Sequence, residues 1–224
     1  MPDDQVDAAL YSLAAFVGEA VGFLGSAGKG IKIVNDLHNM GRRFGINQHP
    51  ENNTTAHQEF LHALTLLATW GAFEASFDDY CFAILRRDAR ASHRRKTLDR
   101  LFEKTKDVQS VIKFEARLTG IDRHGEVPPD LLATLKEASA VRNVWAHAAG
   151  VADDWLVRKF PDLGCVSGEK VRIEKSNVIR YVFALGAYGM ILVSRDRIKN
   201  DKPVLPSELM DKNPFKQEYT ELFG

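Results

Sequence analysis

The stretch TTAHQEFLHALTLLATWGAFEASFDDYCFAILRR (residues 54–87) decides the fold class. It has the length and periodicity of a long helix, and its centre is apolar on nearly all sides. A helix that is apolar all round is normally enclosed by other elements. Thr54 or Thr55 is placed to cap its first turn. We therefore expect residues 54–87 to form the buried central helix of a helical bundle.

Helical periodicity also dominates the rest of the chain. Pro129 suits the first turn of a helix that ends near His147, with Gly150 as its terminator, and Ser176 is placed to cap the last long helix. The further helices expected are 8–25, 31–43, 97–106, 108–118, 129–147, 152–159 and 176–199. Alternating residues near 165–174 suggest a small β-hairpin or an extended arm.

The sequence thus predicts an all-α protein, an up-and-down helical bundle of six or more helices. Residues 1–50 would supply N-terminal helices that pack on the core, and residues 54–199 the main helical domain. Residues 200–224 form a proline-containing tail that we expect to wrap the surface or to be partly mobile.

Composition excludes several classes of protein. Thirty basic and thirty acidic residues cancel among 224, so anion recognition requires a local patch. Cys81 and Cys165 support neither a disulfide framework nor a thiolate metal site, and the seven histidines show no ligand pairing. We expect no metal and no cofactor. Acidic residues precede the apolar segment 8–25 and Glu19 interrupts it, which disfavours a signal peptide or a membrane span. We expect a cytoplasmic protein without a membrane partner.

A basic patch lies between two predicted helices. Only Asp88 opposes its charge, which would suit an RNA backbone, although a solvated interhelical loop has the same composition. The patch consists of Arg86, Arg87, Arg90, Arg94, Arg95 and Lys96.

The stretch RNVWAHAAG (residues 142–150) carries the candidate chemistry. An ideal helix turns about 100° per residue, so Arg142 and His147 would point roughly 140° apart on a straight helix. Cleavage of RNA without metal requires one proton taken from the 2′-hydroxyl and one given to the leaving 5′-oxygen. Histidine transfers protons near neutral pH, and arginine offers a planar fork of donors to a phosphate.

The order Arg142, Asn143, three residues, His147, followed by small residues, a glycine and an acidic helix start, resembles the signature of HEPN-domain ribonucleases. These are all-α, usually dimeric proteins of toxin–antitoxin, abortive-infection and CRISPR-associated systems. The resemblance extends over residues 54–199 and is sharp only around the motif. It implies a metal-independent endoribonuclease with a composite site in a homodimer, held by an inhibitor or antitoxin protein. Ala149 stands where an adenylylated subgroup has tyrosine, so that control is not expected here.

Glu74 lies on an apolar face of the segment 54–87. A carboxylate in such surroundings is costly unless it is paired. Arg142 from a neighbouring helix would pair with it, and relatives in the HEPN family commonly have an acidic residue on this helix. A rim glutamate that faces water or another basic residue is the alternative.

Three interpretations follow from these residues. In the first, His147 is the general acid or base, Arg142 clamps the phosphate, and Asn143 and Glu74 support them. One motif histidine per chain favours a two-fold site, with Val144, Trp145 and Ala148 at the dimer interface. In the second, a non-catalytic HEPN-like module dimerises and binds a nucleotide or a partner protein. In the third, the motif is accidental in an unrelated helical scaffold.

Overall fold

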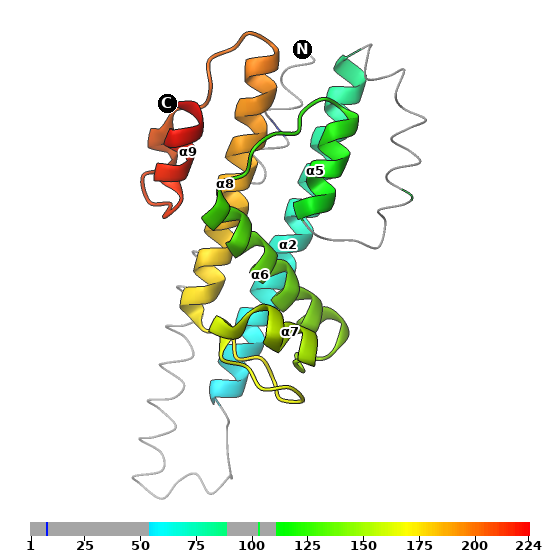
Figure 1. The fold of residues 1–224 in the computed structure, drawn as a ribbon, viewed down its shortest axis with the longest axis vertical. Helices are drawn as coiled ribbons and strands as arrows, with labels where there is room; N and C mark the ends of the chain where they lie inside the picture. Colours follow the sequence, from blue (N-terminus) through cyan, green and yellow to red (C-terminus); the bar gives the residue numbers. More distant parts are fainter. Residues whose placement is uncertain (1–7, 9–53, 89–102, 104–110) are drawn as a thin grey trace, which may run out of the picture.

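The computed structural model describes residues 8, 54–88, 103 and 111–224. Within these residues it contains six α-helices, two short 3-10 helices and no strand, which confirms the all-α class (Figure 1). The N-terminal domain 1–50 and the helices expected at 8–25, 31–43 and 97–106 lie outside the described residues, apart from Ala8 and Glu103. The elements are α2 (Thr54–Arg87), α5 (Val111–Gly120), α6 (Pro129–His147), α7 (Asp154–Lys159), η1 (Pro161–Leu163), α8 (Lys175–Lys199), η2 (Ser207–Met210) and α9 (Lys216–Phe223).

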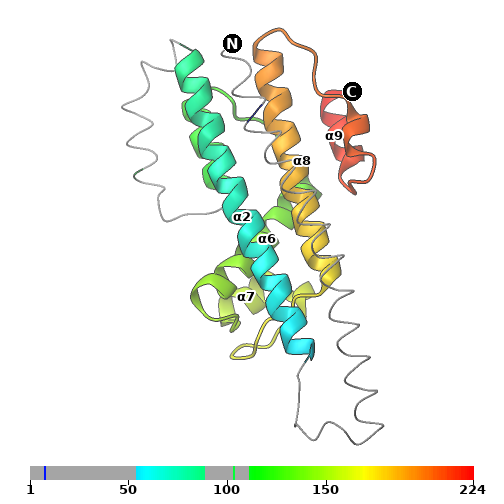
Figure 2. The ribbon, with the colours of Figure 1, turned by 180° about the vertical axis from the view of Figure 1, so that it is seen from behind.

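Helices α2, α6 and α8 contact one another and enclose the core. The helices α2 and α8 lie side by side and run in the same direction, while α6 crosses both (Figures 1 and 2). Two hydrogen bonds agree with this parallel arrangement, because residues further along α2 bond to residues further along the chain near α8. His62 Nδ1 donates to the carbonyl of Ile173 at 2.7 Å, and the Tyr80 hydroxyl donates to the carbonyl of Leu192 at 2.8 Å. This pair therefore departs from a simple up-and-down order.

Aromatic side chains fill the space between α2, α5 and α8. The rings of Phe77 and Phe114 lie 4.6 Å apart, Phe73 meets Phe114 edge-on at 5.4 Å, and Tyr188 of α8 lies 5.8 Å from Phe73. Such rings combine large buried area with favourable ring geometry. Helix α8 is also long and apolar enough to cross a membrane by composition, but 61% of its most apolar window is buried. Core helices share this property.

Helix α2 is buried on one side only. Trp70 and Phe77 are in the core, whereas Phe60 is 56% exposed and Phe82 is 44% exposed. The expectation that this helix is enclosed on all sides is therefore wrong for the chain as the structure describes it. The physical reason is that the described elements that pack on α2, namely α5, α6 and α8, leave the side with Phe60 and Phe82 exposed.

The ends of α6, α7 and α8 test the capping predictions. Helix α6 has the predicted bounds, with Pro129 in its first turn. Helix α7 begins at Asp154 because the Asp153 side chain accepts a hydrogen bond from the Leu156 amide at 2.7 Å. The predicted cap of α8 is wrong, since the Ser176 hydroxyl donates to the Glu174 carboxylate at 3.4 Å instead of accepting from a backbone amide.

Residues 164–174 form an extended arm and no hairpin of their own. The arm pairs with the segment that follows α6: Ala152 N donates to the Glu169 carbonyl and Val171 N to the Gly150 carbonyl, each at 2.8 Å. The alternation in the sequence thus reflects pairing with residues 150–152.

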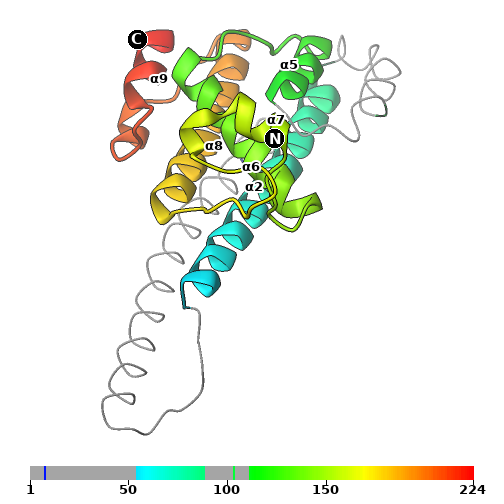
Figure 3. The ribbon, with the colours of Figure 1, turned by 60° about the horizontal axis from the view of Figure 1, so that its bottom comes forward.

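The tail 200–224 folds back on α8, and α9 lies on the side of α8 away from α2 (Figures 1 and 3). The Tyr219 hydroxyl hydrogen-bonds to Ser194 Oγ at 2.5 Å and donates to the Leu205 carbonyl at 2.7 Å. Asn213 Nδ2 donates to the Phe183 carbonyl at 2.9 Å. The first of the two expectations for the tail, a wrap over the surface, is confirmed.

Candidate active site

The last turns of α6 place Arg142 beside Glu74 of α2. Arg142 Nη2 lies 3.6 Å from Glu74 Oε2, which is the contact expected from the sequence. The other oxygen of this carboxylate, Oε1, accepts a hydrogen bond from Trp70 Nε1 at 2.9 Å. This carboxylate therefore has two partners, a hydrogen-bond donor on its own helix and a cation on the crossing helix.

Burial disfavours the charged form of both Glu74 and Arg142. Burial raises the pKa of Glu74, and the hydrogen bond from Trp70 and the charge of Arg142 only partly oppose this effect. Burial also lowers the pKa of Arg142, against the attraction of Glu74. A separation of 3.6 Å exceeds ordinary hydrogen-bond distances, so charge attraction without a hydrogen bond joins the two groups.

The guanidinium of Arg142 is incompletely satisfied. Its Nη1 donates to Asn143 Oδ1 at 2.9 Å, although the residue as a whole is only 9% exposed. Arg142 Nε and Trp145 Nε1 are buried donors without an acceptor among the described residues. Buried donors normally find an acceptor, and those that do not call for an explanation. Both donors come from the same stretch of α6, three residues apart.

His147 is exposed and is the last residue of α6. Because the helix remains regular through His147, its side chain stays about 140° around the axis from Arg142. The end of the helix therefore does not bring the two residues together. Within the described chain no hydrogen bond joins them. Arg142, Asn143 and Glu74 form one cluster, and His147 lies apart from it.

A tight turn closes the end of α6. The Val144 carbonyl accepts from the amides of Ala148 at 2.9 Å and Gly150 at 3.1 Å. Gly150 has φ +85°, and a Cβ at this position would lie 2.9 Å from Cε2 of the Trp145 indole. Ala149, with φ +52°, takes the first left-handed position after the helix, and Gly150 takes the second. The predicted glycine therefore lies in the turn that ends α6 but shares this role with Ala149, and its lack of a side chain is required by the backbone and by the Trp145 ring.

The three predicted interface residues lie in different surroundings. Val144 is 9% exposed in the core of its own chain, and Trp145 is partly buried against that core. Ala148 is exposed. Val144 and Trp145 thus serve internal packing, and Ala148 alone of the three offers an open surface.

The residues of the predicted basic patch also lie in different surroundings. Arg86 is exposed, while Arg90, Arg94, Arg95 and Lys96 lie outside the described residues. Arg87 binds both oxygens of Asp196, with Nη1 to Oδ2 at 2.9 Å and Nη2 to Oδ1 at 2.5 Å. Its charge is therefore engaged inside the fold rather than presented to a polyanion.

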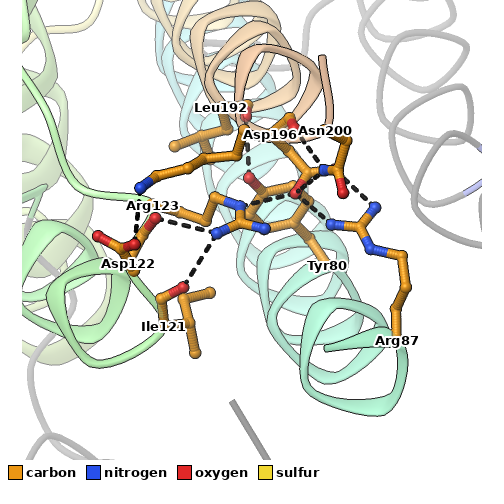
Figure 4. Close-up of polar contacts among 9 residues, drawn as sticks. Tyr80, Arg87, Ile121, Asp122, Arg123, Leu192, Asp196 and Asn200 are labelled. Atoms are coloured by element: carbon orange, nitrogen blue, oxygen red, sulfur yellow. Dashed lines mark hydrogen bonds and ion pairs between the residues drawn. The ribbon is translucent and has the colours of Figure 1, made fainter. Parts of the chain in front are cut away.

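A second arginine completes the cluster around Asp196 (Figure 4). Arg123 Nε donates to Asp196 Oδ1 at 2.7 Å, and Asn200 Nδ2 donates to the backbone carbonyl of Asp196 at 2.6 Å. Burial alone would raise the pKa of Asp196, but the hydrogen bonds and charges of Arg87 and Arg123 outweigh it, and the pKa lies below its ordinary value. Sequence reasoning missed this cluster.

Two further findings bear on the chemistry of the site. Among the described residues, no group of three or more His, Cys, Asp or Glu side chains is arranged to hold a metal ion. In comparisons with family models, with curated proteins and with solved structures, nothing matches this chain. A functional assignment therefore depends on the motif and on the geometry around Arg142.

Proposed function

We propose that this protein is a metal-independent endoribonuclease of HEPN type that acts as a homodimer on single-stranded or looped RNA. The observation that carries the proposal is the state of Arg142. Its guanidinium is held by Glu74 and Asn143 at the end of α6, yet its Nε has no acceptor among the described residues. A phosphate supplies the oxygen acceptors that such a group lacks.

Each residue of the motif has a defined part in this chemistry. Arg142 would bind the scissile phosphate, whose negative charge increases in the transition state. Glu74 and Asn143 would orient the guanidinium and are positioning residues. His147 would take a proton from the 2′-hydroxyl or give one to the leaving 5′-oxygen.

The separation of His147 from Arg142 supports a shared site. The motif supplies one imidazole per chain for two proton transfers, and within one chain it lies about 140° around α6 from the guanidinium. A two-fold arrangement supplies two copies of each residue to one groove. The resemblance also suggests a defence, toxin–antitoxin or growth-arrest context with an inhibitory protein partner.

The test is cleavage of RNA in the presence of a chelator by the wild type and by Arg142→Ala and His147→Ala. We expect both variants to lose about 100-fold or more of the rate. His124→Ala is the matched control because His124 is also exposed but lies in the 121–128 loop, outside the motif. Circular dichroism and thermal unfolding must show that all variants fold. Unchanged cleavage by His147→Ala would refute the proposal.

A second function is favoured by the burial of Arg142. A residue that is 9% exposed presents little surface to a polymer, and a non-catalytic module that binds a nucleotide or a partner protein is compatible with it. This function predicts no cleavage by any form and a thermal stabilisation by nucleotide that Arg142→Ala abolishes.

A further inference from the structure

Two buried N–H groups near the end of α6 have no hydrogen-bond acceptor among the described residues. They are Arg142 Nε and Trp145 Nε1. A buried donor without an acceptor is costly unless a bound molecule completes it. The phosphate proposed above accounts for Arg142 Nε, whereas the indole N–H of Trp145 has no assigned role.

The two donors leave α6 on the same side. Arg142 and Trp145 are three residues apart, which places them about 60° around the helix axis and about 4.5 Å along it. Side chains at this spacing are neighbours on a helix surface. Each donor nitrogen is three bonds from its Cβ, so both can reach one group of atoms beside the helix.

The existing partners of the guanidinium leave its Nε for a further acceptor. Glu74 lies 3.6 Å from Nη2, and Asn143 Oδ1 accepts from Nη1 at 2.9 Å. The nearer oxygen donor–acceptor contact of Glu74 is with Trp70, so this carboxylate does not serve Trp145. The missing acceptor for Arg142 Nε and Trp145 Nε1 therefore has to come from another molecule.

We propose that Arg142 Nε and Trp145 Nε1 together bind one phosphate group, with Trp145 as a second donor to the substrate. A phosphate has several oxygen acceptors, so it can accept from both nitrogens, and its negative charge suits the guanidinium. A water molecule also accepts two hydrogen bonds but brings no charge to Arg142. The assignment of this phosphate to RNA rests on the proposed function.

The turn that ends α6 controls access to the indole. A Cβ at Gly150 would lie 2.9 Å from Trp145 Cε2, the carbon that bears Nε1, so the backbone of the turn lies against this part of the ring. Ala149 beside it has φ +52°, which is unfavourable for a residue with a side chain. Backbone strain of this kind is found where a segment binds or moves. Binding therefore requires residues 148–150 to shift from the ring.

The first test is the affinity for a single-stranded RNA, with His147→Ala in every protein so that the RNA is not cut. Trp145→Phe keeps an aromatic ring and removes Nε1. We expect its affinity to fall about 10- to 100-fold, the value of a hydrogen bond to a charged group. Trp155→Phe is the matched control, because Trp155 is 54% exposed on α7 and should bind as before. Thermal unfolding must show that both variants fold.

A double-mutant cycle tests whether the two donors share one phosphate. Arg142→Lys keeps the positive charge and removes Nε. If both donors bind one group, the double variant should lose less affinity than the product of the two single losses. Losses that multiply would mean two independent contacts and would overturn the proposal.

Tryptophan emission tests whether a phosphate reaches the indole. The chain has three tryptophans, of which Trp70 is 0% exposed, and Trp155→Phe removes the most exposed one. In that background inorganic phosphate should shift the emission, and a further Trp145→Phe change should abolish the shift. Thermal stabilisation by phosphate without a change in emission, or no binding at all, overturns the proposal.

The outcomes separate the indole contact from the ribonuclease. Cleavage of RNA that His147→Ala abolishes, with unchanged RNA affinity in Trp145→Phe, supports the ribonuclease and refutes the indole contact. Phosphate binding that depends on Trp145, in a protein that never cleaves RNA, supports the contact and refutes the ribonuclease.

Discussion

Two arginine–carboxylate clusters along α2 differ in how completely their hydrogen bonds are made. At the end of α2, Asp196 accepts from Arg87 at 2.5 and 2.9 Å and from Arg123 at 2.7 Å. In the middle of α2, Glu74 lies 3.6 Å from Arg142, and Arg142 Nε has no acceptor among the described residues.

The two clusters also differ in the direction of their pKa shifts. At Asp196 the donors outweigh burial and the pKa is lowered, whereas at Glu74 burial prevails and the pKa is raised. A polar cluster that is fully satisfied holds a fold together, and a partly satisfied one is costly unless something else completes it. The comparison therefore assigns a stabilising role to the Asp196 cluster, whereas the Glu74 cluster is the one that we propose to bind a ligand.

The largest expected effect on stability is that of Asp196→Ala. This change removes the carboxylate from the buried Arg123 and the partly buried Arg87, and the free energy of unfolding should fall by about 3–5 kcal/mol. Urea unfolding followed by circular dichroism measures it. Asp122→Ala breaks the exposed pair with Lys199 and should cost about 0–1 kcal/mol. Equal losses in the two variants would contradict the structural role of the Asp196 cluster.

Gly150→Ala should cost about as much as Asp196→Ala at most, and more than Gly168→Ala. Both glycines have positive φ, at +85° and +84°, which costs an alanine about 1–2 kcal/mol. Only at Gly150 would the new Cβ also meet the Trp145 ring, at 2.9 Å, which should add about 1–3 kcal/mol. Thermal unfolding of both variants measures the difference. Equal losses would show that Trp145 yields without cost, and the end of α6 would then be looser than the geometry indicates.

Acidification should weaken the Asp196 cluster. Because the pKa of Asp196 is lowered in the folded protein, its contribution to stability is complete above the unfolded value of about 3.9. That contribution is lost as the pH falls through the lower, folded-state pKa. Unfolding curves from pH 7 to pH 3 should therefore be steeper in pH for the wild type than for Asp196→Asn. If stability depends on pH equally in the two proteins, Asp196 does not contribute to the acid sensitivity of the fold.

Glu74→Gln should have the smallest effect on stability. A raised pKa means that folding disfavours the charged carboxylate, so at neutral pH removal of the charge should stabilise the fold or leave it unchanged, within about 1 kcal/mol. The sign is opposite to that at Asp196. For Glu74 the wild type gains stability relative to Glu74→Gln as the pH falls.

Glu74→Ala completes this series. It removes the acceptor of Trp70 Nε1 and should cost about 1–3 kcal/mol. If Glu74→Ala leaves both RNA cleavage and the free energy of unfolding unchanged, Glu74 has no part in the site.

The clusters also differ in how far the sequence predicts them. Glu74 and Arg142 each carry a local signal: an acid on an apolar helix face and an arginine in a spaced motif. The members of the Asp196 cluster carry none, because Arg87 and Arg123 are 109 and 73 residues from Asp196 and each resembles an ordinary surface charge. From the sequence alone, Arg87 is assigned to the predicted RNA-binding patch, and only the structure shows that it pairs with Asp196.

The fold shows the same dependence on local signals. Pro129, an apolar stripe and Gly150 define α6 from the sequence alone. The pairing of the 164–174 arm with residues 150–152 depends on tertiary contacts and could not be predicted. The apolar surface of α2 predicts that other residues cover the helix. The sequence of α2 does not distinguish a cover from its own chain from a cover by a second copy.

The parallel packing of α2 and α8 has a consequence for synthesis of the protein. Their hydrogen bonds, Tyr80 to Leu192 and Arg87 to Asp196, join residues 112 and 109 positions apart. At about 5–20 residues per second, a ribosome needs roughly 5–20 s to make the intervening chain. During that time the apolar side of α2 that α8 later covers lacks this partner. We therefore expect the nascent chain to be more prone to aggregation before Lys175–Lys199 has emerged than after it.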